Sequence, residues 1–377
     1  MEPLMPATET LFEEKAAPRL HELFHYLRDN KGSDLHLAAG LEPRIRRHGS
    51  LEAVEGWSVL SHEELSGLLR EIADEKDWAE YEKAGDLDFA YGMEGVARFR
   101  ANFLRQENGA GAVFRIIPEE IVSLEQLKLP KAIEGLAHLR QGLVLVTGPT
   151  GSGKSTTLAA IIDLINTTYA KHIVTIEDPV EFVHRNKKSV FSQREVGADT
   201  ESFGAALRAA IRQDADVILV GEMRDLETIS LAVTAAEMGA LVFGTLHTNG
   251  AANTIDRLID AFPADEQAQI RTTLAESIAG IVSQLLLRTA DGKGRCAVNE
   301  ILLKTAGLPN VVREGNTPMI QTIIQSGKNM GMQLMDDALM ALVEAKRITP
   351  HEAFMKAANK GRFEALVKEE GEGEGEA

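Results

Sequence analysis

The chain has 377 residues, 44% of them hydrophobic and 26% charged, which is typical of a soluble globular protein with two or three domains. Lys and Arg number 40 against 57 Asp and Glu, and the net charge of −17 argues against a nucleic-acid partner, because nucleic-acid-binding proteins carry a basic excess. The single cysteine, Cys296, excludes an internal disulfide framework, and no apolar run approaches the roughly 20 residues that cross a bilayer. We therefore expect a cytoplasmic protein whose membrane contact is only peripheral.

The sequence pattern of residues 1–117 predicts a small α+β domain whose N-terminal residues are loosely ordered. From Leu20 to Leu27 the apolar side chains recur at the spacing of one helix face. Ser61 and Glu64 match the pattern of a capping box, which predicts a second helix after Ser61. Short strands separated by glycine-containing turns are predicted at 34–37, 43–47, 86–91, 97–104 and 112–117.

A connector at residues 118–130 leads into a segment, 131–300, in which strands and helices alternate. Strands are predicted at 143–147, 173–176, 217–220 and 241–246, and helices at 154–169, 202–212 and 226–238. Continuous apolar strands between helices favour an α/β fold with a parallel sheet that is covered on both faces. Residues 301–368 have a helical pattern, and the alternating Glu and Gly of 369–377 predict a disordered acidic tail.

A phosphate-binding motif stands between the first of these strands and the first of these helices. Residues 148–155 match the pattern G-x-x-x-x-G-K-[ST] in full. The backbone N–H groups of such a loop face the phosphates, Lys154 reaches the β- and γ-phosphates, and Ser155 binds Mg²⁺. The residues predicted to bind the nucleotide are Gly148, Pro149, Thr150, Gly151, Ser152, Gly153, Lys154, Ser155 and Thr156.

A catalytic base is predicted just beyond the strand at 217–220. Glu222 stands there, and a carboxylate at the carboxyl end of a parallel strand points into the ligand crevice, where it can orient and deprotonate the attacking water. The strand at 173–176 is expected to lie between this strand and the phosphate-loop strand. That extra strand, together with the absence of an Asn-Lys-x-Asp motif from the sequence, favours an ATPase over a GTPase.

Two further groups of polar residues follow strands of the predicted sheet. Glu177, Asp178 and Glu181 lie within five residues of one another, and we expect Mg²⁺ and its waters to offset their mutual repulsion. His247 comes at the end of the strand at 241–246, where it can sense the γ-phosphate or couple it to the strand that carries Glu222.

These motifs together resemble those of the type II/IV secretion ATPase superfamily, over about residues 33–366. Four boxes occur in the superfamily's order: the phosphate loop at 148–155, an acidic box at 176–182, a Walker B box at 216–224 and a histidine box at 245–248. Within the superfamily, the stretches at 33–37, 95–100 and 109–115 are most similar to the PilT-type retraction ATPases of type IV pili.

The resemblance implies a homo-hexameric ring in which an N-terminal PAS-like domain and a RecA-like domain enclose ATP. It implies that Glu222 is the catalytic base and that Glu177 and His247 act within the acidic and histidine boxes. It also implies that Arg100 and Arg115 of the N-terminal domain close on the phosphates.

The function implied by the resemblance is that of a motor. ATP hydrolysis would close the N-terminal domain over the RecA-like domain and so power pilus retraction and twitching motility. The motor would work at the cytoplasmic face of the inner membrane. Its implied partners there are a pilus platform protein and a second retraction ATPase.

One stretch departs from the retraction pattern and leaves alternatives open. Residues 307–314 stand where retraction ATPases have Ala-Ile-Arg-Asn-Leu-Ile-Arg-Glu, and Pro309 replaces the first arginine. An accessory, PilU-like retraction ATPase and another secretion-system ATPase are therefore alternatives, whereas the lone Cys296 argues against extension ATPases, which carry a four-cysteine zinc motif. A regulatory nucleotide-binding module with little turnover and a nucleic-acid motor are the alternatives of other classes.

Overall fold

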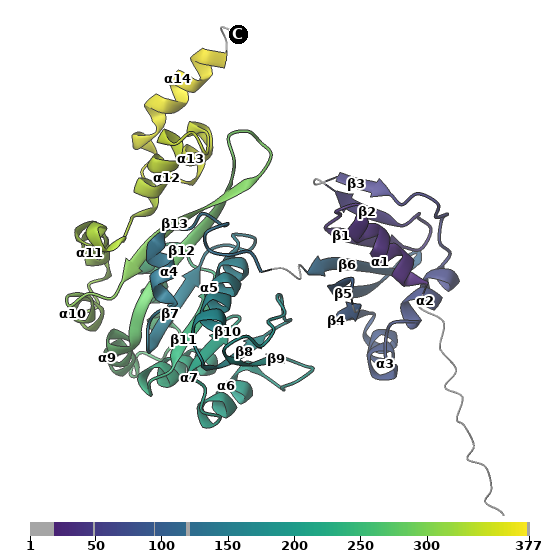
Figure 1. Ribbon diagram of the computed structural model, residues 1–377, viewed down its shortest axis with the longest axis horizontal. Helices are drawn as coiled ribbons and strands as arrows, with labels where there is room; N and C mark the ends of the chain where they lie inside the picture. The colour runs from purple at the N-terminus through teal and green to yellow at the C-terminus, as the bar shows by residue number, and fades with distance from the viewer. Residues whose placement is uncertain (1–18, 48–49, 94, 118–120, 375–377) are drawn as a thin grey trace, which may run out of the picture. The chain divides into compact units, whose positions relative to one another are not determined.

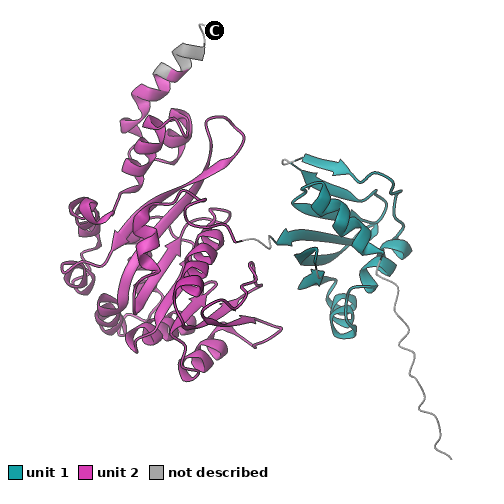
Figure 2. Cartoon of the chain, viewed as in Figure 1, with its two compact units in different colours: residues 1–119 teal, residues 120–377 magenta. Residues whose placement is uncertain are grey.

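The computed structural model describes residues 19–47, 50–93, 95–117 and 121–374. The chain forms two compact units, unit 1 (Met1–Glu119) and unit 2 (Glu120–Ala377), which are described separately below (Figure 2). The boundary falls inside the predicted connector at 118–130. The loose start predicted at the N-terminus lies outside the described residues.

Unit 1 is an α+β domain built on one six-stranded sheet (Figure 1). The strand order is β3-β2-β1-β6-β5-β4, and all neighbouring strands are antiparallel. Its elements are α1 (Leu20–Asp29), β1 (Asp34–Ala38), β2 (Arg44–Arg47), β3 (Ser50–Ala53), α2 (His62–Arg70), α3 (Glu75–Ala84), β4 (Asp86–Met93), β5 (Ala97–Gln106) and β6 (Gly109–Ile117).

Alternation of side chains along these strands gives the sheet of unit 1 one apolar face. Against that face, Phe24 of α1 stacks on Phe99 of β5 at 4.2 Å between ring centroids and meets Phe114 of β6 edge-on at 5.0 Å. Both tryptophans of the chain, Trp57 and Trp78, pack at the margin of this core. The aromatic contacts therefore fix α1 across the middle of the sheet.

Unit 2 is an α/β domain with a seven-stranded sheet in the order β13-β12-β7-β11-β10-β8-β9 (Figure 1). Neighbouring strands are parallel except for β12 and β13, which confirms the parallel sheet that the sequence predicts. The strands are β7 (Gly142–Thr147), β8 (His172–Glu177), β9 (Val190–Glu195), β10 (Val217–Val220), β11 (Leu241–Leu246), β12 (Ile278–Arg288) and β13 (Arg295–Leu303). The helices are α4 (Lys131–Leu136), α5 (Lys154–Thr168), α6 (Phe203–Arg212), α7 (Leu226–Glu237), α8 (Ala251–Asp260), α9 (Gln267–Ser277), α10 (Leu308–Arg313), α11 (Ile320–Ser326), α12 (Met335–Glu344), α13 (Pro350–Lys356) and α14 (Glu364–Glu374).

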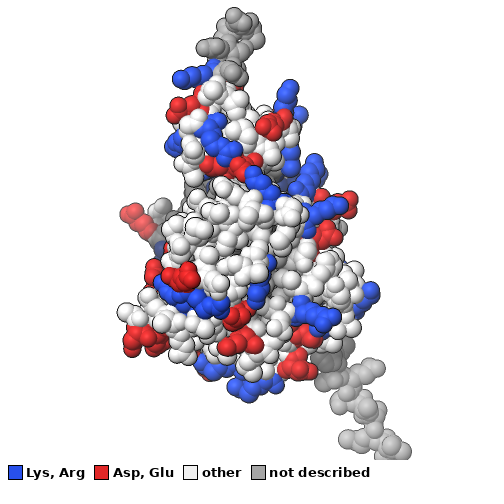
Figure 3. Space-filling model, turned by 90° about the vertical axis from the view of Figure 1, so that its left-hand side faces the viewer, with Lys and Arg blue, Asp and Glu red and all other residues white. Residues whose placement is uncertain are grey.

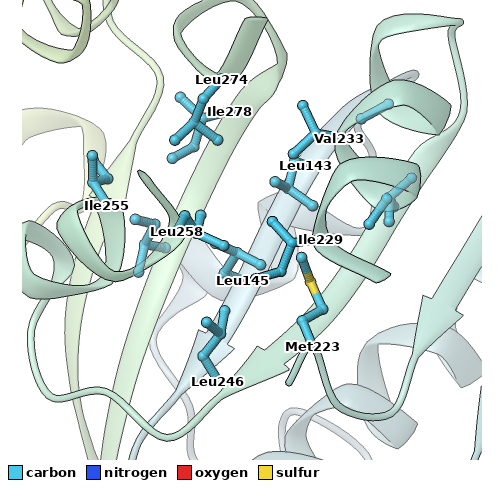
Figure 4. Close-up of a cluster of buried hydrophobic side chains, with 14 of the residues drawn as sticks. Leu143, Leu145, Met223, Ile229, Val233, Leu246, Ile255, Leu258, Leu274 and Ile278 are labelled. Atoms are coloured by element: carbon cyan, nitrogen blue, oxygen red, sulfur yellow. The ribbon is translucent and has the colours of Figure 1, made fainter. Parts of the chain in front are cut away.

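Helices cover both faces of this sheet. On one face, Leu143 and Leu145 of β7 and Leu246 of β11 pack against Ile229 and Val233 of α7, together with side chains of α6 and α8–α11 (Figure 4). The alternate residues of the same strands form a second buried cluster with α4 and α5 on the other face. Two buried faces favour strands that are apolar nearly throughout: β10 is apolar at every position, and β7 and β11 are buried at every position, with Thr147 and Thr245 as their polar residues.

Three predicted boundaries differ from those in the structure. Leu124, inside the predicted connector, is buried in the core of unit 2 beside Ile133, so the connector is shorter than the sequence indicates. Strand β13 crosses the predicted limit at residue 300. Helix α14 (Glu364–Glu374) extends into the range 369–377, for which the sequence predicts a disordered tail.

The surface of unit 2 mixes both signs of charge. On the side of α10 and α11, Lys and Arg side chains are interspersed with Asp and Glu around a mainly uncharged centre (Figure 3). Among the described residues, no helix has both the length and the apolar character needed to cross a membrane.

Candidate active site

The phosphate loop connects β7 to α5, and its shape depends on glycine. Gly148, Gly151 and Gly153 have φ values of 142°, 78° and 85°, a region that favours glycine. A Cβ atom on Gly148 would overlap the carbonyl oxygen of Gln284 and lie 2.8 Å from the Ser152 hydroxyl oxygen. The loop therefore folds tightly against the middle of β12 at Gln284, with its last glycine at the N-cap of α5.

The lysine of the motif is held over this loop. Lys154 is 9% exposed, and its Nζ donates hydrogen bonds to the carbonyl oxygens of Gly148 and Pro149 at 3.0 and 3.2 Å. Burial lowers the pKa of Lys154, while the negative charges of Glu222 and Glu181 oppose that shift. The ammonium group thus lies at the loop within the electrostatic reach of two of the predicted carboxylates.

Glu222 lies immediately beyond β10, and neighbouring side chains hold both of its carboxylate oxygens. Its Oε2 is 2.6 Å from Nη2 of Arg224, and its Oε1 is 3.2 Å from Nε2 of His247. The hydrogen bond from Arg224 is the main cause that lowers the pKa of Glu222, although partial burial opposes it. Glu222 is therefore ionised at neutral pH, as a proton acceptor must be.

Backbone hydrogen bonds fix the position of Glu222. The Gly221 N–H donates to the carbonyl of Ile176 at the end of β8 (2.8 Å), and the Met223 N–H donates to the carbonyl of Thr245 on β11 (3.0 Å). The segment that carries Glu222 is thus tied to both neighbouring strands.

The acidic box follows β8 on the same edge of the sheet. Glu177 is 9% exposed; its Oε1 accepts a hydrogen bond from the Gln193 side chain at 3.2 Å, and its Oε2 accepts one from the Glu181 N–H at 3.3 Å. Burial raises the pKa of Glu177, and the charge of Glu181 adds to the rise. Asp178 and Glu181 are exposed. Asp216 lies at the opposite end of β10, where it accepts a hydrogen bond from Nζ of Lys171 at 2.8 Å.

The strand order of the site differs from the one expected from the sequence. The strand at 173–176, β8, does not separate the phosphate-loop strand from the Glu222 strand; β11, which ends beside His247, lies between β7 and β10. Order along the chain does not determine order in a doubly wound sheet, because a crossover helix can place the next strand on either side. His247 is therefore closer to the centre of the site than the sequence indicates.

Arg100 and Arg115 lie in unit 1 and form a cross-strand pair on β5 and β6. Nε of Arg115 donates a hydrogen bond to Oδ1 of the buried Asp34 at 2.7 Å, although the Arg115 side chain itself is 69% exposed. Arg100 is half exposed, with its Nε 4.0 Å from Oδ1 of Asp88. Both guanidinium groups thus have surfaces open to an anion.

The residues present fit ATP and Mg²⁺. The Ser152 hydroxyl oxygen is buried without a hydrogen-bond partner in the described structure, as expected of a group that faces a ligand, and the loop has room only for glycine at 148. Among the described residues, no three His, Cys, Asp or Glu side chains are arranged to bind a metal by themselves. The Ser155 hydroxyl at the start of α5 suits Mg²⁺, which keeps most of its waters and takes its other ligands from phosphates.

A cavity of about 640 Å³ adjoins the loop within unit 2. Gly153, Thr156, Leu127, Leu129 and Cys296 are among the residues that line it. Its size and mixed lining suit a nucleoside.

Three residues of the site were not predicted as members: Gln284, Gln193 and Arg224. Gln193 and Gln284 contact the acidic box and the phosphate loop from strands that the sequence analysis missed. A glutamine within the apolar run of residues 278–287 is the signal that could have identified Gln284.

Comparisons with known proteins identify the family and the fold of the chain. A family model described as type II/IV secretion system protein matches residues 20–366. The type IV pilus retraction ATPase PilT of Pseudomonas aeruginosa is 48% identical over 336 residues, which cover 89% of this chain and 97% of that protein. The type IV pilus ATPase PilU of the same species is 37% identical over 347 residues, which cover 92% and 91%. A crystal structure of the pilus retraction motor PilT with bound ADP matches with a TM-score of 0.86 at 41% identity and covers 92% of this chain and 98% of that one.

Proposed function

The chain belongs to the type II/IV secretion system protein family and is a P-loop ATPase with a RecA-like domain, and we propose that it is a motor for retraction of a type IV pilus. The observation that carries this proposal is the similarity to PilT over nearly the whole length of both chains. It favours the principal retraction ATPase over the accessory one, because the identity to PilU is 37% against 48% to PilT. Pro309 lies at the start of α10, where proline is well tolerated, and does not oppose this choice.

In the proposed reaction, the loop from Gly148 to Thr156 holds the phosphates and the cavity beside it takes the nucleoside. Lys154 leaves the loop carbonyls for the β- and γ-phosphates, which offer it full negative charges. Mg²⁺, when bound at Ser155, neutralises phosphate charge, and Glu177, Asp178 and Glu181 position its waters.

Glu222 accepts the proton of the attacking water in this scheme. Arg224 and His247 hold its carboxylate in one orientation and keep it ionised, so the base is ready when the water arrives. His247 also follows directly after β11, the strand that pairs with the phosphate-loop strand β7, which suits it to couple the γ-phosphate to the base.

Assembly of several copies of the chain would bring further positive charge to the phosphates. We infer a closed homo-hexamer in which unit 1 of one copy meets the nucleotide held by a unit 2, so that Arg100 and Arg115 contact the γ-phosphate and the domains close on it. The ring would act on a platform protein at the cytoplasmic face of the inner membrane, together with a second retraction ATPase.

A Glu222→Gln variant tests this function. The amide keeps the shape of the side chain but cannot accept the proton, so phosphate release is expected to fall by about 10²–10⁴-fold while ATP still binds. Light scattering with ATP and Mg²⁺ is expected to give a hexamer. Cells that lack the gene, or that carry this variant, are expected to be covered in pili and unable to twitch.

Each alternative predicts a different result. A deletion strain without pili would mark an extension motor, and a purified chain that binds ATP but releases no phosphate would mark a regulatory module. Stimulation of hydrolysis by DNA or RNA would mark a nucleic-acid motor.

A further inference from the structure

One buried polar side chain lies directly beneath the phosphate loop. Gln284 is 1% exposed and lies on β12, the strand that pairs with the phosphate-loop strand through Ser283 and Thr147. Burial of an amide is costly unless its polar atoms are hydrogen-bonded. A glutamine in this place, within an otherwise apolar stretch, therefore needs partners that only the loop and its neighbours supply.

The amide group of Gln284 connects two parts of the phosphate motif. Its Nε2 donates a hydrogen bond to the Ser152 carbonyl oxygen in the loop at 2.7 Å, and its Oε1 accepts one from the Thr157 hydroxyl in the first turn of α5 at 2.9 Å. Its own backbone carbonyl occupies the space beside Gly148 that a Cβ would need. One residue thus contacts the beginning and the end of the loop and the helix behind it.

A second amide fixes the orientation of the first. The Ser152 carbonyl can only accept a hydrogen bond, so it requires the nitrogen of Gln284, and Asn299 Nδ2 donates to the opposite atom, Oε1, at 2.9 Å. Asn299 is 1% exposed on β13, and its backbone carbonyl oxygen accepts a hydrogen bond from Nε2 of Gln333 at 2.7 Å. The Gln284 amide is therefore held in one orientation, with its nitrogen toward the loop.

We propose that Gln284 is a positioning residue for the ATPase reaction, which holds the phosphate loop in the conformation that receives the β-phosphate, with Asn299 as the residue that orients it. The loop is the part of the site that binds phosphate, so the effect depends on the number of phosphates in the ligand. Gln284 also borders the cavity, but it is 1% exposed and its side chain bonds to the loop, so ADP binding depends on Gln284 more strongly than AMP binding does.

Gln284→Met tests the proposal, since methionine has nearly the same length and removes all three side-chain hydrogen bonds. Competition against a fluorescent ADP measures the dissociation constants of ADP and AMP. We expect the ADP constant to rise about tenfold and the AMP constant to change by less than about twofold. Gln333→Met is the control, because it removes a partly buried amide hydrogen bond to the Asn299 backbone but no contact with the loop. Its ADP constant is expected to stay within about twofold of wild type.

Two results overturn the proposal: an unchanged ADP constant in folded Gln284→Met, or an equal loss of ADP and AMP binding, which would mark a general loss of structure. If Gln284→Met does not fold, the variants Thr157→Val and Asn299→Ala test the proposal in its place. Each removes one hydrogen bond to Oε1 and is expected to weaken ADP binding about threefold without the same loss for AMP. Unchanged ADP binding in both variants would equally reject the role of Gln284.

Discussion

Replacement of Gly148 by alanine probes how closely the phosphate loop packs on β12. The backbone there has φ 142°, which costs an L residue about 1–3 kcal/mol, and the added Cβ overlaps the Gln284 carbonyl and lies 2.8 Å from the Ser152 hydroxyl. Overpacking of this kind costs a further 1–3 kcal/mol or so, which brings the expected destabilisation to about 2–6 kcal/mol. Gly151→Ala is the matched control, because φ is 78° and no atom lies within 4 Å of its added Cβ. It is expected to cost about 1–2 kcal/mol from backbone strain alone.

Calorimetric unfolding without nucleotide measures the difference, since neither variant then involves the ligand. In a domain the size of unit 2, each kcal/mol of destabilisation lowers the melting temperature by about 2–4 °C. Gly148→Ala is therefore expected to melt at least about 4 °C below wild type. It is also expected to melt at a lower temperature than Gly151→Ala. ADP titration is expected to show a parallel loss of affinity, because a loop displaced by about 1 Å no longer matches the phosphates. Equal melting temperatures for the two variants, with ADP affinity intact in Gly148→Ala, would refute the close packing.

Further predictions concern the charged groups and the cavity. Lys154→Ala is expected to weaken ATP binding itself, which calorimetry measures; an unchanged affinity would remove Lys154 from the site. Arg100→Ala and Arg115→Ala are each expected to lower turnover, by up to about 10³–10⁵-fold, far more than ADP affinity, and the reverse pattern would contradict their action on the γ-phosphate. Burial raises the pKa of Asp34, but hydrogen bonds from Ser33 and Arg115 outweigh the effect of burial and hold this pKa below its usual value. The ionised Asp34 therefore stabilises unit 1 above about pH 4, and this contribution is lost as the pH falls through the lower folded-state pKa. Unfolding of unit 1 followed by the fluorescence of its two tryptophans is expected to show this acid dependence in wild type and a flatter one in Asp34→Asn. ADP is expected to slow alkylation of Cys296, the single thiol, and equal rates with and without ADP would place the nucleoside outside the cavity.

Local sequence signals predicted those parts of the fold that depend on local interactions. Strands β10 and β11 begin and end at the bounds predicted from the sequence, 217–220 and 241–246, because a strand buried on both faces is a mainly apolar run; Thr245 is the one polar residue within these two strands. The helix after Ser61 begins as predicted, with both hydrogen bonds of its capping box. Strand β12 was missed because it follows α9 directly at Ile278, without a glycine or proline to separate them.

The candidate site likewise contains residues that the sequence predicts and residues that it does not. The phosphate loop could be predicted because its residues are consecutive and its chemistry is contained in the glycines and the lysine. The contact of Gln284 with Thr157 could not, since 127 residues separate them and only the folded sheet brings β12 beside β7. The place of His247 next to Glu222 likewise depends on the spatial position of β11, which no local pattern records.

The position of β11 between the phosphate-loop strand and the Glu222 strand has a consequence for control of the enzyme. Backbone ladders on both sides of β11 join the two halves of the catalytic centre into one rigid frame, so the distance from phosphate to base is set when unit 2 folds. If the frame stays fixed during turnover, we expect the rate to be controlled by groups that reach it from outside, such as Arg100 and Arg115 in the proposed hexamer.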